Sequence, residues 1–207
     1  MVVDGGVNVF LRAIENNYID KDVYHLGDFD STDLNVLENY TAKFGNYKKI
    51  FSPDQDFNDY EKTLIYIQDN LEQFTESSDI FVYGLMGSRF DHTISNLCKT
   101  MQYNEKETLS KFNFFAVAEE YQVAFLRKGN YEIIVENYHE KDKGVGIMSL
   151  LGVIDNIVTD GLKWNINNDW PLGILEKQST SNEIVKDYVT IDCDKSFIFS
   201  LQILHDL

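Results

Sequence analysis

The chain has 207 residues, 43% of them apolar and 14% aromatic, with only two prolines. This composition predicts a globular protein of one large or two small domains and excludes extensive disorder. Its 18 basic and 34 acidic residues give a formal charge of −16, which repels phosphate backbones and anionic membrane surfaces and argues against nucleic acid and membrane partners.

The first half of the chain alternates between helix and strand patterns. The clearest helix covers Asp59–Phe74, where apolar residues recur every three or four positions, Asn58 is a suitable N-cap and Glu61 follows three residues later. Such alternation predicts a mostly parallel sheet with helices on its faces, a Rossmann-like α/β domain over residues 1–113. The other predicted elements are, in chain order, a strand ending at Val3, a helix over Val7–Asn16, a strand over Asp22–Leu26, a helix over Leu34–Phe44, a strand over Lys48–Phe51, a buried strand over Ile80–Tyr83 and a helix ending near Met101.

The second half shows strand patterns without a helical stripe. Tyr121–Arg127 and Tyr131–Asn137 flank a Lys-Gly-Asn turn and predict a hairpin. Residues 114–207 are expected to form an all-β domain of the sandwich or barrel type, and we assign a β-sandwich. Further strands are predicted over Gly146–Leu151, Leu162–Ile166, Val185–Ile191 and Phe197–Leu204.

Charged residues follow four of the predicted strands. Ligands bind outside the carboxyl ends of the strands in open α/β sheets, so these side chains are expected to converge there. Clustered carboxylates suit hard cations such as Mg²⁺, which an acidic protein needs in order to bind phosphates. The residues are Asp4, Asp28 with Asp30, Asp56 with Asp59, and Arg89 with Asp91.

Each of these motifs also has a purely structural interpretation. Asp28–Asp30 is compatible with a turn stabilised by side-chain hydrogen bonds, and Asp54–Asp59 with helix capping, although it fails as a calcium loop. Gly84–His92 lacks both standard phosphate-binding loops, so Arg89 is the main support for phosphate binding there. His92 by itself is more typical of a capping or core histidine than of a catalyst.

Cys98 and Cys193 are far apart and in no metal-ligand spacing, as in proteins of reducing compartments. No charged-then-apolar leader opens the chain, and no apolar run approaches the length of a membrane span. We expect a cytoplasmic protein.

The motifs, in order and along nearly the whole chain, resemble those of the thiamine pyrophosphokinase family. The family's Asp-Gly-Gly-x-Asn, Gly-Asp-Phe-Asp-Ser and Pro-Asp-Gln-Asp-x-Thr-Asp-x-x-Lys are matched by Asp4–Asn8, Gly27–Ser31 and Pro53–Lys62, with Asn58 in the Thr position. Its Gly-x-x-Gly-Gly-Arg-x-Asp-His/Gln, Gly-Leu-Lys-Trp and Ser-Thr-Ser-Asn correspond to Gly84–His92, Gly161–Trp164 and Ser179–Asn182. Ser88 departs from the second Gly of the Gly-Gly-Arg pair. A strand and a helix usually precede Asp-Gly-Gly in the family, and we expect this chain to lack them.

The resemblance implies transfer of a pyrophosphoryl group from ATP to the hydroxyl of thiamine, with Mg²⁺ as cofactor and AMP as second product. It implies a homodimer whose site lies at the subunit interface, between the α/β domain of one chain and the β domain of the other. Trp164 would offer an aromatic face to the thiazolium ring, although from the sequence it is equally compatible with a core residue. The implied roles are metal binding by Asp28, Asp30, Asp56 and Asp59; catalysis by Asp28, Asp30, Asp59, Arg89 and Asp91; binding of ATP or its phosphates by Asp4, Gln55, Lys62, Arg89 and His92; and thiamine binding by Trp164, Ser179, Ser181 and Gln55.

Two other functions stay open at this point. Asp28–Thr32 fits the Asp-x-Asp-x-Thr signature of haloacid-dehalogenase-type phosphatases, although Gly27 stands where an apolar strand should directly precede the motif. A non-catalytic relative would bind thiamine or nucleotide and release no AMP.

Overall fold

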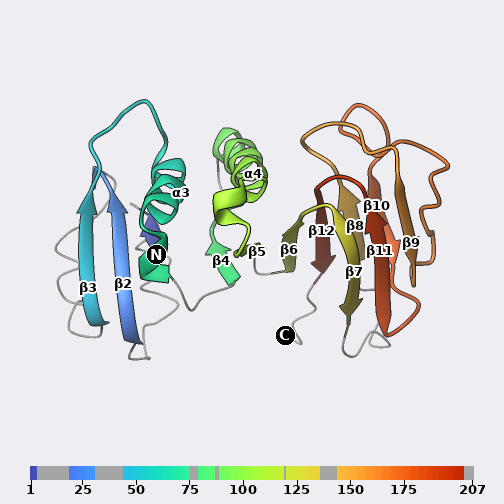
Figure 1. The fold of residues 1–207 in the computed structure, drawn as a ribbon, viewed down its shortest axis with the longest axis horizontal. Helices are drawn as coiled ribbons and strands as arrows, with labels where there is room; N and C mark the ends of the chain where they lie inside the picture. Colours follow the sequence, from blue (N-terminus) through green and yellow to red (C-terminus); the bar gives the residue numbers. More distant parts are fainter. Residues whose placement is uncertain are drawn as a thin grey trace. The chain divides into compact units, whose positions relative to one another are not determined.

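The computed structural model describes residues 1–3, 19–30, 44–74, 79–86, 89–118, 120–135 and 144–202 (Figure 1). Asp4, the helix predicted over Val7–Asn16, and the helix predicted over Leu34–Phe44, except Phe44 itself, lie outside these residues. Contacts divide the chain into two compact units, Met1–Thr75 and Glu76–Leu207. Within the described ranges, no helix is both long and apolar enough to cross a membrane.

The first unit contains a parallel three-stranded sheet in the order β1-β2-β3, formed by Val2–Val3, Ile19–Gly27 and Phe44–Phe51. The strands predicted over Asp22–Leu26 and Lys48–Phe51 are confirmed, and each begins three or four residues earlier than expected. The helix α3 (Asp59–Asp69) packs against β1 and β2 and buries its apolar stripe there. These elements position the residues that follow β2 and β3.

Helix α3 begins where the sequence predicts and ends earlier. Asn58 Oδ1 accepts the Glu61 N–H at 2.8 Å, which confirms the predicted N-cap. The expected continuation to Phe74 is interrupted at Asn70, whose φ of −126° and ψ of 39° leave the helical region. A 3₁₀ turn, η2 (Leu71–Phe74), completes the segment.

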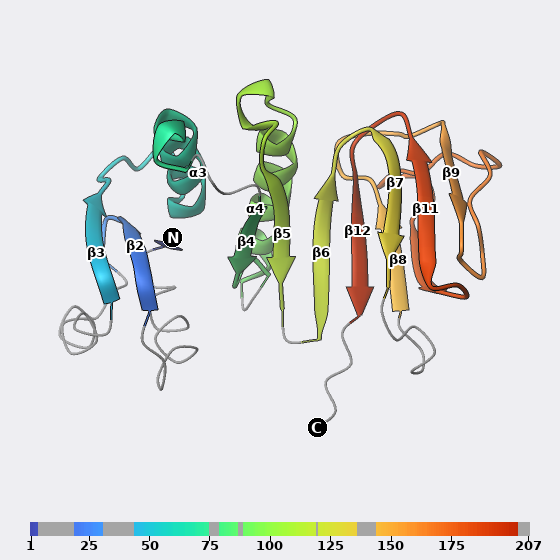
Figure 2. The ribbon, with the colours of Figure 1, turned by 60° about the horizontal axis from the view of Figure 1, so that its bottom comes forward.

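The second unit contains a mixed six-stranded sheet in the order β10-β8-β12-β6-β5-β4 and an antiparallel three-stranded sheet in the order β7-β11-β9 (Figure 2). In the larger sheet β4 and β5 pair in parallel, and the other described neighbours pair antiparallel. Helix α4 (Phe90–Asn104) and the 3₁₀ turn η3 (Glu107–Leu109) connect β4 to β5. The strands are β4 (Asp79–Tyr83), β5 (Asn113–Val117), β6 (Tyr121–Leu126), β7 (Gly129–Ile134), β8 (Gly144–Met148), β9 (Ile157–Asp160), β10 (Ser179–Glu183), β11 (Tyr188–Cys193) and β12 (Phe197–Gln202).

Apolar side chains from both sheets of the second unit share one core. Ile147 of β8 and Phe199 of β12 belong to the same buried cluster as Val189 and Ile191 of β11. The cluster residues of each strand lie two positions apart, as Val145 and Ile147 do in β8, so one face of each strand contributes to this core. A sheet-rich second half is therefore confirmed.

The predicted hairpin over Tyr121–Arg127 and Tyr131–Asn137 is wrong in its pairing. Strand β6 already has a partner at each edge, because Phe125 lies opposite Phe114 of β5 and Ile198 of β12. Strand β7 pairs with β11 in the other sheet. The turn between β6 and β7 is a crossing from one sheet to the other.

Arg127 lies in this turn between β6 and β7, called the corner below, and fixes it by hydrogen bonds to backbone carbonyls. The fork geometry of a guanidinium allows several such bonds at once. The Tyr131 hydroxyl in turn donates to the Arg127 carbonyl at 3.0 Å. The guanidinium donates to the carbonyl oxygens of Asn104, Leu109, Ser110 and Phe112, at 2.7, 3.0, 3.3 and 3.0 Å respectively.

Other strand predictions also need correction. The strand predicted over Leu162–Ile166 is a loop, in which Leu162 forms an isolated bridge with Ile184. Strand β11 begins at Tyr188, three residues after the predicted start, and β5, β9 and β10 were not predicted. Strand β4 was expected to be buried, yet its residues alternate between exposed and partly buried.

The change of pattern near residue 113 does not coincide with the boundary between the compact units. Strand β4 pairs with β5, and α4 contacts β5 and β6, so both elements group with Glu76–Leu207. The mostly parallel description holds for β1, β2 and β3, whereas the sheet that contains β4 is mixed. The division into domains 1–113 and 114–207 stays a prediction.

Candidate functional site

The ends of β2 and β3 place two polar segments at one edge of the first sheet. The parallel register pairs Gly27 with Phe51, the last residue of each strand. The Ser52 N–H continues this pairing by donating to the Gly27 carbonyl at 3.0 Å. Residues 28–30 and 53–58 therefore leave the sheet together, where open parallel sheets bind ligands.

Asp28 accepts hydrogen bonds at both of its carboxylate oxygens. Gln55 Nε2 donates to Oδ2 at 3.0 Å, and the Asp30 N–H donates to Oδ1 at 3.2 Å. These two bonds, the Gln55 bond above all, and the positive charge of Lys62 hold the pKa of Asp28 below its ordinary value. Asp28 is thus an ionised and oriented carboxylate, as a cation site requires.

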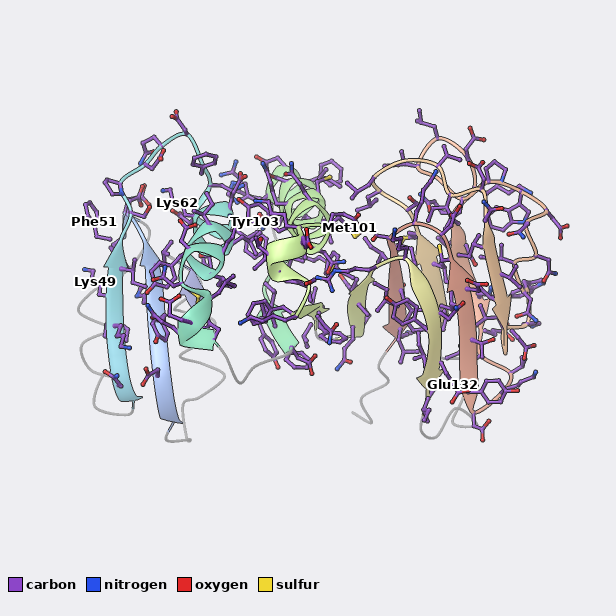
Figure 3. All side chains as sticks on the ribbon, viewed as in Figure 1. Lys49, Phe51, Lys62, Met101, Tyr103 and Glu132 are labelled. Atoms are coloured by element: carbon purple, nitrogen blue, oxygen red, sulfur yellow. The ribbon has the colours of Figure 1, made fainter. Side chains whose placement is uncertain are left out.

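Phe29 lies between the two carboxylates in a left-handed backbone conformation, with a φ of 65°. That conformation costs a non-glycine residue about 1–2 kcal/mol. Its ring stands edge-on to His25 at 4.8 Å and stacks on Phe51 at 6.4 Å between centroids. Lys49 Nζ lies 4.2 Å from the Phe29 ring centroid, and Lys49 and Phe51 project from the same side of β3 (Figure 3). Packing of the Phe29 ring stabilises the turn that carries both carboxylates.

Lys62 links α3, from which it projects (Figure 3), to the end of β3. Only 6% of the residue is exposed. Its ammonium donates to Asp59 Oδ1 at 2.9 Å and to the Ser52 carbonyl at 3.2 Å. A buried ammonium held beside the strand ends is suited to pair with phosphate oxygens.

The carboxylates of this edge do not form a ready-made metal cage. Within the part of the chain that the structure describes, no group of three or more His, Cys, Asp or Glu residues is arranged to hold a metal ion. Asp56 is exposed, and its N–H donates to Asp54 Oδ1 at 2.7 Å. The structure thus links Asp28 with Gln55 and Asp59 with Lys62, and the metal site of four carboxylates stays a prediction.

Arg89, Asp91 and His92 follow β4 in the second unit, at the start of α4, with Arg89 as the N-cap residue. The Arg89 guanidinium donates to Asp91 Oδ2 at 2.6 Å and to Oδ1 at 3.2 Å. The bond raises the pKa of Arg89 and lowers that of Asp91. A guanidinium presented in this way also matches the oxygens of a phosphate. His92 is exposed in the first turn of the helix.

The Gly-Leu-Lys-Trp motif forms a tight loop that exposes an aromatic ring. Gly161 has a φ of 93°, and a Cβ at this position would lie 2.2 Å from the Tyr188 carbonyl oxygen, so the loop requires glycine. Leu162 is buried in the core, and its N–H donates to Asn165 Oδ1 at 3.0 Å. Trp164 is 56% exposed, which rules out the interpretation of its ring as a core residue of this unit.

The two predicted thiamine-binding serines of β10 have different surroundings. Ser179 is buried, and its Oγ accepts from Asn182 Nδ2 at 3.2 Å. Ser181 is exposed, has a φ of 56° and lines a groove of about 400 Å³ whose apolar walls include Met148 and Ile198. Ser181 is therefore accessible to a ligand, whereas Ser179 binds the side chain of Asn182.

Two residues of these sites were not singled out from the sequence. Asn182 binds the backbone of Trp164. The sequence feature that could have identified it is its place at the end of the Ser-Thr-Ser-Asn motif. The Phe29 ring packs against His25 and Phe51 and so stabilises the turn that carries two carboxylates. The sequence feature that could have identified it is a large aromatic residue inside Gly-Asp-Phe-Asp-Ser. Neither contact follows from spacing alone.

Comparisons with known proteins agree along most of the chain. The family described as "Thiamin pyrophosphokinase, catalytic domain" matches residues 1–111, and "Thiamin pyrophosphokinase, vitamin B1 binding domain" matches residues 130–198. Thiamin pyrophosphokinase 1 of Caenorhabditis elegans is 28% identical over 207 residues, 98% of this chain and 78% of the relative. Thiamine pyrophosphokinase 1 of Arabidopsis thaliana is 28% identical over 194 residues, 92% of this chain and 68% of the relative.

Solved structures show the same fold. Thiamin pyrophosphokinase from Candida albicans has a TM-score of 0.79 at 23% identity and covers 97% of this chain and 80% of its own. The yeast thiamin pyrophosphokinase structure has a TM-score of 0.74 at 20% identity and covers 98% of this chain and 77% of its own. Because the two family matches together include the carboxylate-bearing strand ends and the Trp164 loop, the chain belongs to the thiamin pyrophosphokinase family.

Proposed function

We propose that the chain is a Mg²⁺-dependent thiamine pyrophosphokinase, which transfers the pyrophosphoryl group of ATP to the hydroxyl of thiamine. Family membership supports the pair of substrates. The structural observation that supports it best is the hydrogen bond between Gln55 and Asp28, which joins two of the family's motifs at one sheet edge. Thiamine diphosphate and AMP are the proposed products.

The residues at this edge fit a magnesium ion. Mg²⁺ in nucleotide sites is usually held by one or two carboxylates together with water and substrate phosphates, so a cage of protein carboxylates is not required. Asp28, whose pKa is lowered, is the first candidate ligand, and Asp30, Asp56 and Asp59 are the others. When bound, Mg²⁺ would neutralise charge on the phosphate oxygens.

Other side chains of the chain would position the triphosphate. Lys62 and Arg89 offer donors and positive charge to phosphate oxygens. Gln55 orients Asp28 through its amide and would contact substrate, and Asp91 orients the Arg89 guanidinium in the same manner. We add Asp4 and His92 as further contacts to ATP.

The reaction exchanges one bond to phosphorus for another. The thiamine hydroxyl oxygen bonds to the β-phosphorus, the bond between that phosphorus and the oxygen shared with the α-phosphate breaks, and AMP leaves with this oxygen. The hydroxyl proton passes to a nearby carboxylate or to water. Because the transition state of phosphoryl transfer is loose, positioning and electrostatics carry most of the catalysis.

Trp164 is the proposed binding face for the positive thiazolium ring. A cation–π contact with tryptophan is worth about 1–2 kcal/mol when desolvated. Lys163 Nζ lies 4.6 Å from the ring centroid and also pairs with Glu183 at 2.8 Å, so a cation is already held beside the ring. We propose that Ser181 contacts thiamine directly and that Ser179 acts through Asn182.

We further propose a homodimer in which the β domain of one subunit completes the site of the other, and a cytoplasmic location. The dimer rests on the family resemblance. Free thiols at Cys98 and Cys193 support a reducing compartment.

Incubation of the protein with Mg²⁺, ATP and thiamine, followed by detection of AMP and thiamine diphosphate, tests the proposal. We expect Asp59→Asn nearly to abolish AMP release without unfolding the chain, and wild-type turnover in that variant would reject its role. Trp164→Ala should raise the KM for thiamine more than that for ATP. Equal effects on both would make Trp164 a packing residue.

The same assay separates the two alternatives. A phosphohydrolase would release phosphate from simple phosphomonoesters without thiamine. A non-catalytic relative would bind nucleotide or thiamine in calorimetry and yet form no AMP. Neither alternative is favoured by the family matches.

A further inference from the structure

The exposed Trp164 ring rests on a backbone that is held from a neighbouring strand. The Lys163 N–H donates to the Glu183 carbonyl at 2.9 Å, and the Val185 N–H donates to the Gly161 carbonyl at 2.9 Å. The loop is thus fixed along β10 and the residues that follow it. The Trp164 ring, by contrast, projects from this fixed backbone into solvent.

Asn182 holds the backbone of Trp164 on both sides of the residue. Its Oδ1 accepts the Trp164 N–H at 3.2 Å, and its Nδ2 donates to the Trp164 carbonyl at 2.8 Å. Oδ1 also accepts the Glu183 N–H at 2.9 Å, and Nδ2 also donates to Ser179 Oγ at 3.2 Å. An amide side chain offers two donors and two acceptor positions, so all four are used. Asn182 is 2% exposed, and these bonds are therefore made away from water.

A bulge in β10 turns Asn182 inward. Side chains alternate along a regular strand, so residues three apart lie on opposite faces. The pairing of β10 with β8 shifts between Ser179 and Asn182, and Ser181 adopts a φ of 56° there. As a result Ser179 and Asn182 are both buried and bonded to each other, while Ser181 stays exposed. Bulges commonly re-aim side chains next to active sites.

We propose that Asn182 is the positioning residue for the Trp164 ring, and hence a determinant of thiamine affinity; this rests on the proposed function. A cation–π contact requires the cation to sit over the ring face within about 6 Å of its centroid. An exposed tryptophan on a loose loop would lose entropy on every binding event, whereas a fixed backbone removes most of that cost. Asn182 need not touch the substrate to act in this way.

The experiment uses the full chain with Trp170→Phe, which leaves Trp164 as the sole tryptophan, because the sequence has two. Into this background we introduce Asn182→Ala and Asn182→Asp. Aspartate keeps the volume and one acceptor of asparagine but cannot donate to the Trp164 carbonyl. Asn104→Ala is the matched control, since Asn104 is also fully buried and donates to a backbone carbonyl, that of Phe125, at 3.1 Å.

Time-resolved fluorescence anisotropy reports the nanosecond mobility of Trp164, and steady-state kinetics report the two KM values. We expect both Asn182 variants to increase the mobile fraction of Trp164 and to raise the KM for thiamine about tenfold, the factor that corresponds to about 1.4 kcal/mol for ordering a mobile side chain on binding. The KM for ATP should stay within about twofold. Asn104→Ala should lower thermal stability while leaving Trp164 mobility and both KM values close to those of the background chain.

Two results would overturn the proposal. One is an unchanged Trp164 anisotropy decay in both Asn182 variants. The other is an equal rise of both KM values in the Asn182 variants, because their effect would then not be confined to the ring proposed to bind thiamine. If the parent protein forms no thiamine diphosphate, the proposed function fails, but the anisotropy comparison still decides whether Asn182 fixes Trp164.

Discussion

Gln55 Nε2 donates a hydrogen bond to Asp28 Oδ2 at 3.0 Å, so a side chain after β3 orients a carboxylate after β2. The two residues are 27 positions apart, and the parallel register of their strands brings them together. Gln55 also donates to the Pro53 carbonyl at 3.3 Å, which fixes the amide in its own turn. An oriented carboxylate needs no reorganisation when its ligand arrives.

Gln55→Ala should reduce AMP release about 10–100-fold, the usual cost of losing a residue that orients a metal ligand. The Gln55 bond is the main cause of the lowered pKa of Asp28. A depressed pKa keeps Asp28 ionised to lower pH, so loss of the bond should move the acid limb of the kcat/KM profile to higher pH. Asp54→Asn, in the same acidic segment, is the control and should leave the profile in place. An unmoved acid limb in Gln55→Ala would show that this bond does not tune Asp28.

Phe29 offers a test of backbone strain at the same turn. Glycine adopts a φ of 65° freely, whereas alanine pays about 1–2 kcal/mol for it. Both substitutions remove the ring contacts with His25 and Phe51 and should lower the free energy of unfolding. We therefore expect Phe29→Gly to be more stable than Phe29→Ala by about 1 kcal/mol in urea unfolding. The reverse order would mean that the left-handed turn is absent in solution.

Arg127→Lys should destabilise the protein by about 2–4 kcal/mol, because an ammonium cannot replace a fork that serves four carbonyls and would leave some of them unpaired. Denaturant unfolding measures this loss. Turnover by the folded fraction should be retained, since Arg127 has no proposed role in the site. Exposed Lys128 is the neighbouring control, and Lys128→Ala should be close to neutral. Equal stability of Arg127→Lys and the parent chain would show that the hydrogen bonds of Arg127 do not stabilise the corner.

Mixed dimers test the proposed shared site. When Asp28→Asn and Trp164→Ala chains are coexpressed, half of the dimers are mixed, and each mixed dimer has one site without either substitution. Activity should recover to about a quarter of the parent value, well above that of either variant alone. Activity equal to the mean of the two variants would place each complete site within a single chain.

Local patterns predicted the parts of this fold that depend on neighbouring residues. The N-cap Asn58 and the start of α3 depend on a few adjacent side chains, and both are confirmed. Strands β2 and β3 were found from short apolar and β-branched stretches, although their bounds were not. The segments that carry Asp28 and Asp56 were predicted to follow strand ends at one edge of a sheet, and β2 and β3 pair in parallel with Gly27 opposite Phe51.

Pairing between distant strands was not accessible to the same reasoning. The turn after Tyr121–Leu126 looks like a hairpin turn, but both edges of β6 are taken by β5 and β12. The Leu162–Ile166 segment has the composition of a strand, yet Gly161 packs its backbone against Tyr188 and the chain turns there. Asn182 faces inward because of a bulge, and no periodic pattern signals a bulge.

The most direct test of the central claim is the fate of the β-phosphorus of ATP. Protein, Mg²⁺, thiamine and ATP labelled at the β-phosphorus are incubated, and the labelled products are separated. Transfer of a pyrophosphoryl group predicts label in thiamine diphosphate and unlabelled AMP in equal amount. Labelled ADP together with thiamine monophosphate, or label that stays in ATP, would contradict it.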